Sequence, residues 1–438
     1  MNSKIEKGYS GRNQLLPPAE QLVMILDRIY RCGMTTTSGG NLSLLDSNGD
    51  IWITPTGIDK GSLTSADIVR VKPDGTIIGK YQPSCELPFH RLIYQNRPDV
   101  KAIVHAHPPA LVSFSIVRKI PQTKLIPDVE FICGEIKMAE YALPGSIDLG
   151  NKIAAAFTSG VNIVMLENHG VVVAGTDIFE AFMAFETLEF SAQMEINAYQ
   201  IGQPVSLNTT EIEKVGQTRK AVTQMSEFVP QSHSSEERQA RKEMVDFIHR
   251  AYDQKLISST QGTFSIRLNE HSFIITPEMV DRKYLTVNQI VRIDEETKEA
   301  GKIPSTLVWL HKRIYDHDPD VHSIIDAYPP NIGAFAVTKE GFDSRTIPES
   351  YIVLRNVRKA PFEPDLIQFD LKTFTKENPI VMVENRCIIV TGNSPLKAFD
   401  RLEVAESTAK TIIAARRIGK IVSIKQDQVT EIEGAFPL

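Results

Sequence analysis

The feature that most constrains the fold of this chain is that its sequence repeats itself. The segment PSCELPFHRLIYQNRPDVKAIVHAHPP, which begins at Pro83, aligns without gaps with PSTLVWLHKRIYDHDPDVHSIIDAYPP, which begins at Pro304. Further along, VMLENHGVVVAG from Val164 matches VMVENRCIIVTG from Val381. Close to the ends of the repeats, IGQPVSL from Ile201 matches IGKIVSI from Ile418. Such self-similarity indicates two copies of one structural unit in tandem.

The length of the chain agrees with this division. Its 438 residues suit two domains of roughly 200 residues better than one core. The polar segment VPQSHSSEE, which begins at Val229, has the composition of a solvated linker. We therefore predict a first domain over residues 1–230, called copy one, and a second over residues 231–438, called copy two.

Composition and charge exclude several classes of protein. The chain has no apolar run near the roughly 20 residues that span a bilayer, and its polar start, MNSKIEKGYSGRNQ, does not resemble a signal peptide. The net charge is −6, with basic and acidic residues interspersed, which argues against nucleic acid as a partner. The cysteines form no CxxC pair and fit a reducing compartment; they are Cys32, Cys85, Cys133 and Cys387. We expect a cytoplasmic protein that binds neither membranes nor nucleic acid.

The order of expected elements in copy one indicates an α/β fold. Apolar residues recur at helical spacing over 19–32, and helices are also expected over 85–96 and 177–199. Strands are expected over 100–107 and on both sides of a turn within 162–174. The dipeptides Asn48-Gly49 and Asp74-Gly75 lie between apolar runs, where they predict hairpins. The sequence therefore predicts a sheet that is at least partly antiparallel and is covered by helices.

A histidine pair in an expected strand is the strongest chemical signal. His105 and His107 are two residues apart, so a strand turns both rings to the same face. A catalytic zinc site usually has three protein ligands, and His169, which precedes Gly170 in a turn, is the natural third. Another divalent transition metal would suit the same ligands. The alternative is that all three are ordinary core histidines.

Glu86 lies at the start of the helix expected over 85–96. Beside a metal, its carboxylate is expected to serve as a fourth ligand or as a general base. The alternative is an acid in the first turn of a helix, which the helix dipole stabilises.

Three small polar segments have the composition of anion-binding turns. Residues 38–41 (SGGN) and 54–57 (TPTG) offer backbone N–H groups, and Ser84 and Cys85 lie where the N–H groups of a helix are unpaired. Phosphate is the anion expected to bind there. Each segment alone is more often only a turn.

The combination of SGGN, TPTG, PSCE, HAH and ENHG, in this order, resembles the class II aldolase and adducin head-domain family over roughly 190 residues of copy one. The resemblance implies a three-layer α/β/α fold with a mainly antiparallel central sheet, present twice. It implies zinc ligands at His105, His107 and His169, with Glu86 as acid/base group. The phosphate of a sugar phosphate would then be bound by Asn41, Thr56, Gly57, Ser84 and Cys85.

The activity implied by the resemblance is that of a zinc-dependent lyase. Such an aldolase cleaves a ketose phosphate to dihydroxyacetone phosphate and an aldehyde, with zinc as a Lewis acid. Copy one departs from the family pattern at Cys85, where a second serine is usual, and at Phe131, where the aldolases use a tyrosine. Two alternatives to an aldolase therefore stay open. The first is a decarboxylase or epimerase that acts on a phosphorylated sugar or sugar acid, and the second is a non-catalytic scaffold of adducin type. The family's epimerases carry aspartate at the position of Glu86, which argues against that subtype.

Copy two retains none of the expected metal ligands. The positions of Glu86, His105, His107 and His169 hold Leu307, Asp326, Tyr328 and Arg386. The pair Thr56-Gly57 becomes Glu278-Met279, which puts a negative charge where phosphate would lie. We expect copy two to be inactive, with Asp326 and Arg386 forming an ion pair in place of the metal.

The resemblance also implies an oligomer. Family aldolases and epimerases are ring-shaped tetramers, so a homo-oligomer is expected here. A dimer of the duplicated chain would reproduce a ring of four domains.

Overall fold

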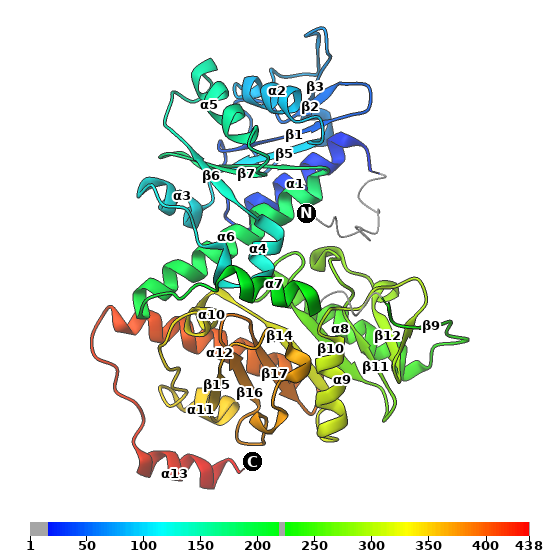
Figure 1. The fold of residues 1–438 in the computed structure, drawn as a ribbon, viewed down its shortest axis with the longest axis vertical. Coiled ribbons are helices and arrows are strands. Elements are labelled where there is room, and N and C mark those ends of the chain that lie inside the picture. The colour runs from blue at the N-terminus through cyan, green and yellow to red at the C-terminus, as the bar shows by residue number, and fades with distance from the viewer. Residues whose placement is uncertain (1–15, 219–223, 438) are drawn as a thin grey trace. The chain divides into compact units, whose positions relative to one another are not determined.

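The structure is a computed structural model that describes residues 16–218 and 224–437 (Figure 1). Its described part divides into two compact units. The N-terminal unit lies within Ser10–Thr123 and Asp128–Gln193, and the C-terminal unit within Lys124–Pro127 and Met194–Leu438. The division at Met194 falls inside a continuous helix. The last part of copy one, from Met194 onward, therefore packs with copy two.

Copy one contains an eight-stranded sheet in the order β4-β3-β2-β1-β5-β8-β7-β6. All neighbouring strands are antiparallel except β6 and β7. The strands are β1 (Asn41–Leu45), β2 (Ile51–Ile53), β3 (Val69–Val71), β4 (Ile77–Ile78), β5 (Ala102–Ala106), β6 (Ile136–Ala139), β7 (Ile163–Leu166) and β8 (Val171–Gly175). Both predicted hairpins are confirmed, because β1 pairs with β2 and β3 with β4 across the two turns.

Helices cover both faces of this sheet (Figure 1). The helices of copy one are α1 (Pro18–Arg31), α2 (Leu87–Asn96), α3 (Pro109–Ile116), α4 (Pro127–Cys133), α5 (Ile147–Phe157), α6 (Ile178–Ile201) and α7 (Thr209–Thr218). The end of α6 and all of α7 belong to the C-terminal unit and do not form part of these layers. On one face, α2 and α5 bury residues such as Phe89, Ile153 and Phe157 against the strands. On the other face, α1 buries Leu22, Ile25 and related residues at helical spacing. The predicted three-layer fold with a mainly antiparallel sheet is confirmed.

Copy two repeats this arrangement. Its sheet runs β15-β16-β17-β14-β10-β11-β12-β13, the same order as in copy one, with β9 (Glu227–Phe228) added at the edge. The strands are β10 (Thr263–Arg267), β11 (Ser272–Ile275), β12 (Val291–Asp294), β13 (Thr297–Glu299), β14 (Ser323–Ala327), β15 (Val357–Ala360), β16 (Ile380–Val383) and β17 (Cys387–Gly392). The helices are α8 (Ser235–Asp253), α9 (Val308–His317), α10 (Pro330–Ala336), α11 (Pro348–Leu354), α12 (Pro395–Arg416) and α13 (Gln426–Ala435). The duplication predicted from the sequence is therefore also a duplication of the fold.

The registers of the central strands are the same in the two copies. In copy one, His105 on β5 lies opposite Asn41 on β1 and Val172 on β8. In copy two, the corresponding Asp326 lies opposite Thr263 and Ile389. Any difference in chemistry between the copies is therefore a difference of side chains on one shared backbone frame.

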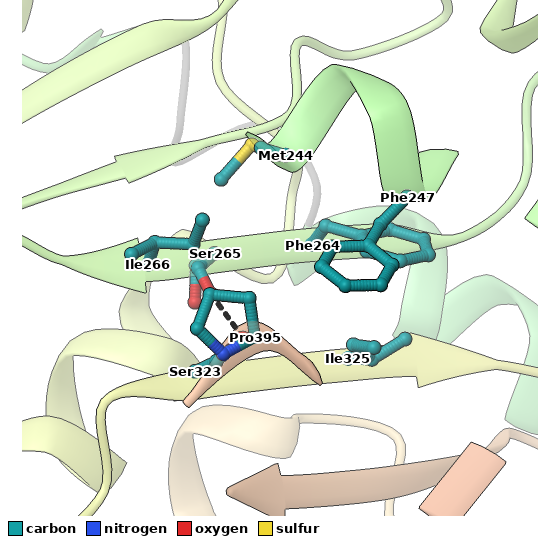
Figure 2. A pocket seen from close by; sticks show the side chains of 8 residues that line it. All are labelled: Met244, Phe247, Phe264, Ser265, Ile266, Ser323, Ile325 and Pro395. Carbon is teal, nitrogen blue, oxygen red and sulfur yellow. Dashed lines mark hydrogen bonds between the residues drawn. The ribbon is translucent and has the colours of Figure 1, made fainter. Parts of the chain in front are cut away.

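Copy two has a small cavity between α8, β10, β14 and the start of α12 (Figure 2). Its volume is about 10 Å³, which is room for about one water molecule. The wall is largely apolar, and Ser323 Oγ donates a hydrogen bond to the backbone oxygen of Ser265. The cavity is too small for an organic ligand.

In the part of the chain that the structure describes, no helix is long and apolar enough to cross a membrane.

Candidate metal centre

Three histidine rings meet at the end of β5 in copy one. His105 lies on β5, His107 follows it directly, and His169 lies in the turn between β7 and β8. One ligand atom from each ring lies within 4.8 Å of the other two, and the ring centroids are 4.9–5.0 Å apart. His105 is fully buried and donates through Nδ1 to the backbone oxygen of Val171 at 3.0 Å. This bond leaves Nε2 directed at the other rings, as in histidines that bind metals.

Two backbone features bring His169 to the cluster. Asn168 adopts the left-handed conformation, with φ of 55°, which turns the chain sharply before His169. Gly170 packs so closely on β5 that an added Cβ would lie 2.5 Å from the backbone oxygen of Ala106 and 2.7 Å from the His107 ring. In copy one the turn at Asn168 thus lies so close to β5 that position 170 has no room for a side chain.

Glu86 completes the cluster from a different element. It caps the start of α2, is 6% exposed, and places Oε2 3.2 Å from His105 Nε2 and Oε1 3.9 Å from His169 Nε2. Asn41 Nδ2 donates to Oε2 at 2.7 Å, whereas Oε1 is buried without a hydrogen-bond partner among the described residues. A buried carboxylate oxygen left unpaired beside three imidazoles fits a divalent cation, which would satisfy all four groups.

The protonation of these groups also favours a cation. Burial opposes ionisation of Glu86, but the neighbouring His105 and the hydrogen bonds from His105 and Asn41 outweigh it and hold its pKa below its usual range. Burial and the charge of His105 lower the pKa of His107 to about 3 and that of His169 to about 4. For His105, burial is outweighed by Glu86, which raises the pKa. His107 and His169 are therefore neutral at physiological pH, the form that binds a metal.

A buried chain of hydrogen bonds supports Glu86 from behind. His90 Nε2 lies 2.6 Å from Asn41 Oδ1, and His90 Nδ1 lies 2.7 Å from Ser43 Oγ, which in turn lies 2.7 Å from Tyr94 Oη. Burial lowers the pKa of His90 to about 3, so its ring is neutral and donates through only one nitrogen. Donation from Nε2 to Asn41 Oδ1 fixes the Asn41 amide with its Nδ2 towards Glu86.

The sequence analysis did not identify His90 as a site residue. Its signal was present, because His90 lies four residues after Glu86 and aligns with His311 of copy two. His311 makes the same hydrogen bond to a serine, Ser265, which contacts Tyr315. The Ser–His–Tyr group therefore belongs to the shared fold, whereas its connection through Asn41 to Glu86 belongs to copy one.

Backbone hydrogen bonds connect the predicted anion-binding segments or residues close to them. The Lys60 amide donates to Thr37 O at 2.9 Å, and the Ser84 amide donates to Thr54 O at 3.1 Å. Thr56, Gly57 and Cys85 are exposed, and Gly57 has a φ of +67° that favours glycine. Residues 54–57 are thus joined directly to Ser84, and residues 38–41 are connected to them through Thr37 and Lys60.

Two of the predicted phosphate ligands are largely buried. Ser84 Oγ accepts a hydrogen bond from the Glu86 amide at 3.3 Å. The Asn41 side chain is held by Glu86 and His90. The structure therefore gives both side chains a second task, which is to position Glu86.

Lys60 is a further residue that the sequence analysis missed. It is buried, its Nζ donates to the Pro55 backbone oxygen at 2.5 Å, and burial lowers its pKa to about 8. In copy two the corresponding Arg282 makes the matching contacts, to Pro277 O and, through its amide, to Ser259 O. The cation is present in both copies and ties the two turns together.

In copy two, the predicted pairing of Asp326 with Arg386 is wrong. Among the ion pairs that the structure describes, the partner of Asp326 is His311 Nε2, and Cys387 Sγ donates to the same carboxylate at 3.4 Å. The prediction considered only the positions of the lost ligands. It overlooked His311, whose counterpart His90 faces Asn41 in copy one.

The carboxylate of Glu278 lies beside the start of α9 in copy two. Glu278 replaces Thr56, and its Oε2 accepts a hydrogen bond from the backbone N–H of Thr306 at 3.3 Å, at the start of α9. Thr306 corresponds to Cys85 in copy one. Copy two thus holds a carboxylate of its own at a position predicted to bind phosphate in copy one.

Comparison with known proteins agrees with the fold. The family described as Class II Aldolase and Adducin N-terminal domain matches residues 20–196 and again residues 242–413. A three-layer α/β/α unit whose first copy carries a histidine cluster and an adjacent glutamate is thus a class II aldolase-like unit. The chain belongs to this family and contains two tandem copies of its domain.

Several relatives are sugar-phosphate enzymes, and each match spans about one copy. The chain is 38% identical over 172 residues to an L-fuculose phosphate aldolase from Methanococcus maripaludis, covering 39% of this chain and 89% of the relative. It is 30% identical over 201 residues to a 5-deoxy-D-ribulose 1-phosphate aldolase from Bacillus thuringiensis, covering 45% and 92%. It is 34% identical over 178 residues to a 3-oxo-tetronate 4-phosphate decarboxylase from Pectobacterium atrosepticum, covering 40% and 81%. By their names, two of these relatives are aldolases of sugar phosphates and the third is a decarboxylase of a phosphorylated sugar acid, so their reactions differ.

Proposed function

We propose that copy one is a zinc-dependent lyase that cleaves a carbon–carbon bond in a phosphorylated sugar. The observation that carries this proposal is the cluster of His105, His107 and His169 with the unpaired Oε1 of Glu86. A scaffold would gain nothing from a buried carboxylate whose second oxygen has no hydrogen-bond partner beside three imidazoles. Such a group is costly unless a cation or a reacting proton uses it.

The three histidines would hold the metal, and Glu86 would be either a fourth ligand or a base. When bound, the metal supplies a Lewis acid that polarises the carbonyl and hydroxyl oxygens of the substrate. Glu86 Oε1 would accept the proton of a substrate hydroxyl as the neighbouring carbon–carbon bond breaks. Its other oxygen stays fixed by Asn41, so the position of the base is set by the chain through His90.

The joined turns at Thr56, Gly57, Ser84 and Cys85 would bind the phosphate. Ser84 and Cys85 lie at the start of α2, where helix N–H groups favour an anion, and Thr56 and Gly57 are exposed in the turn that is bonded to Ser84 through Thr54 O. Copy two supports this assignment, because the carboxylate of Glu278 accepts a hydrogen bond from the corresponding N–H, that of Thr306. The carboxylate bound at this N–H in copy two supports an anion at the equivalent N–H, that of Cys85, in copy one.

The preferred reaction is cleavage of a ketose phosphate to dihydroxyacetone phosphate and an aldehyde. The second candidate is decarboxylation of a phosphorylated 3-oxo sugar acid. Phe131, on α4, favours decarboxylation, because this phenylalanine stands where a family aldolase would have the tyrosine that donates a proton. The two reactions differ in their need for a base, since decarboxylation removes no hydroxyl proton.

A panel of ketose phosphates and phosphorylated sugar acids, incubated with zinc-loaded protein, tests the proposal. An aldehyde beside dihydroxyacetone phosphate is expected from an aldolase, and carbon dioxide from a decarboxylase. Glu86→Gln should keep its zinc and abolish aldol cleavage, because the amide cannot accept a proton. Absence of turnover on the whole panel by zinc-loaded protein would reject a lyase function.

A further inference from the structure

The loop that precedes β10 in copy two carries a run of buried polar side chains. Ser258, Thr260 and Gln261 are 1%, 8% and 6% exposed. The hydroxyl oxygens of Ser258 and Thr260, and both the amide oxygen and the amide nitrogen of Gln261, are buried without a hydrogen-bond partner among the described residues. Such atoms are rare and costly, because folding removes their hydrogen bonds to water. Four of them on one loop indicate that the loop is built to contact something other than the chain itself.

This loop is the counterpart of the predicted anion-binding segment 38–41 of copy one. The sequence TQGTFS from Thr260 aligns with SGGNLS from Ser38. The two loops share one backbone frame, since Gly262 and Gly40 both have a positive φ, of 88° and 73°. The unpaired atoms of copy two therefore lie on the loop that is expected to face the substrate in copy one.

Gln261 has a side chain at a position where copy one has none. Its counterpart is Gly39, where an added Cβ would lie 3.0 Å from His107 Nδ1. On the shared frame, the Gln261 side chain starts from this point, beside the position of Tyr328, which replaces His107 and is buried. The Gln261 side chain thus enters the region that the candidate metal centre occupies in copy one.

The charges around the loop favour a neutral ligand. Arg282 is buried, and its guanidinium donates to Gly262 O at 3.2 Å and to Pro277 O at 3.0 Å. A cation is therefore already built in beside the loop and would repel a second one. An anion is disfavoured as well, because Glu278 takes the helix N–H that would attract it and Asp326 replaces a histidine of copy one.

The unpaired groups also have the hydrogen-bonding character that suits a polyol. A hydroxyl both donates and accepts, an amide oxygen accepts, and an amide nitrogen donates. A compound with several neighbouring hydroxyl groups can satisfy all of these atoms without bringing a charge. We propose that copy two binds a small neutral polyol through Ser258, Thr260 and Gln261. This site is separate from the candidate metal centre and does not depend on the reaction proposed for copy one.

The loop is covered in copy two, whereas its counterpart in copy one is open. Ser258 and Thr260 are buried, and the equivalent Thr36 and Ser38 are exposed. A ligand must therefore enter when the loop opens locally, and once bound it holds the loop closed. Amide hydrogen exchange over residues 258–263 reports on this opening directly.

Hydrogen exchange of the full chain with and without erythritol tests the proposal. At a concentration of about nine times its Kd, erythritol should slow exchange over residues 258–263 about ten-fold, while residues 36–41 of copy one stay unchanged. Inorganic phosphate, as the anionic comparison, should leave residues 258–263 unchanged. The proposal would be overturned by an absence of slowing over 258–263, by equal slowing in both copies, which marks a general cosolvent effect, or by the same slowing with phosphate.

Two substitutions identify the groups that bind. Thr260→Val and Gln261→Met keep nearly the same shape and remove the unpaired polar atoms. Each should weaken the apparent affinity for erythritol by about ten-fold, as expected when a hydrogen bond to the ligand is lost. Thr346→Val is the matched control, because Thr346 also has a buried hydroxyl without a hydrogen-bond partner among the described residues of copy two but lies outside the loop. It should keep the wild-type affinity. Wild-type affinity in Gln261→Met would show that the loop does not bind the polyol.

Stability without ligand gives a second, independent measurement. Replacing an unpaired buried polar group with an apolar one should raise the urea midpoint of copy two, so Thr260→Val and Gln261→Met should both be more stable than the parent. Fluorescence of Trp309 on α9 follows this unfolding in a Trp52→Phe background. A lower midpoint in both variants would show that these side chains already have partners within the chain, which would remove the basis of the proposal.

Discussion

The same substitution in the two copies should have different effects on stability. His90 and His311 occupy equivalent positions, are both fully buried, and both bond to a serine through Nδ1. They differ in what faces Nε2, which is the neutral amide of Asn41 in copy one and the carboxylate of Asp326 in copy two. His90→Leu therefore removes the partner of a neutral amide, whereas His311→Leu removes the partner of a buried carboxylate.

The magnitudes follow from the groups left unpaired. His90→Leu leaves Asn41 Oδ1 without its partner, while Ser43 keeps Tyr94, so we expect a loss of about 1–3 kcal/mol in the free energy of unfolding of copy one. His311→Leu leaves the Asp326 carboxylate with only the weak thiol donor Cys387, so we expect a loss of about 3–5 kcal/mol in copy two. Copy two should thus lose about 2 kcal/mol more than copy one.

Urea unfolding can report on each copy separately, because the chain has only two tryptophans. Trp52 lies on β2 and Trp309 on α9, so Trp52→Phe and Trp309→Phe backgrounds each leave one reporter. Unfolding is followed by fluorescence in metal-free buffer, with the parent tryptophan variants as controls. Equal losses, or a larger loss for His90→Leu, would refute the claim that the buried carboxylate depends on His311.

Three further predictions concern the metal centre and copy two. His105→Ala should reduce zinc from about one ion per copy-one domain to background in metal analysis, and unchanged zinc would place the metal elsewhere. Gly170→Ala should weaken zinc binding in a chelator competition, because its Cβ would lie 2.5 Å from Ala106 O, whereas Gly419→Ala, with open space around it, should not. Burial raises the pKa of Glu237, but hydrogen bonds from Arg241 and His233 outweigh burial and hold this pKa below the ordinary 4.5. The stability that ionised Glu237 contributes is therefore present above pH 4.5 and is lost as the pH falls through the pKa of Glu237 in the folded protein. Glu237→Gln should therefore flatten the decline in the urea midpoint of copy two below pH 4.5, and an unchanged slope would contradict this role.

The sequence predicted those parts of the site that depend on local geometry. His105 and His107 share a face because strand residues alternate, and the turn at His169 is recognisable from Gly170. The repeat predicted which residues of copy two replace the ligands, since the alignment has no gaps over the segment that holds the histidine pair. In these cases the spacing along the chain determines the spacing in space.

Contacts between distant segments could not be predicted in the same way. His90 reaches Asn41 across 49 positions and Ser43 across 47, and nothing in the local pattern indicates these pairings. For the same reason the partner of Asp326 was predicted wrongly, because His311 approaches from a separate helix. The boundary of the compact units at Met194 was equally hidden, since α6 runs through it without any change in composition.

The shared register of the two sheets makes copy two a ready host for a second metal centre. Asp326 lies opposite Thr263 and Ile389 just as His105 lies opposite Asn41 and Val172, and the turn at Asn385 repeats that at Asn168. Grafting the centre therefore requires side chains only, without any redesign of loops or strand lengths. The exchanges are Leu307→Glu, Asp326→His, Tyr328→His, Arg386→His and Cys387→Gly. In a duplicated chain of this kind, one copy can receive a new site while the other copy keeps its own.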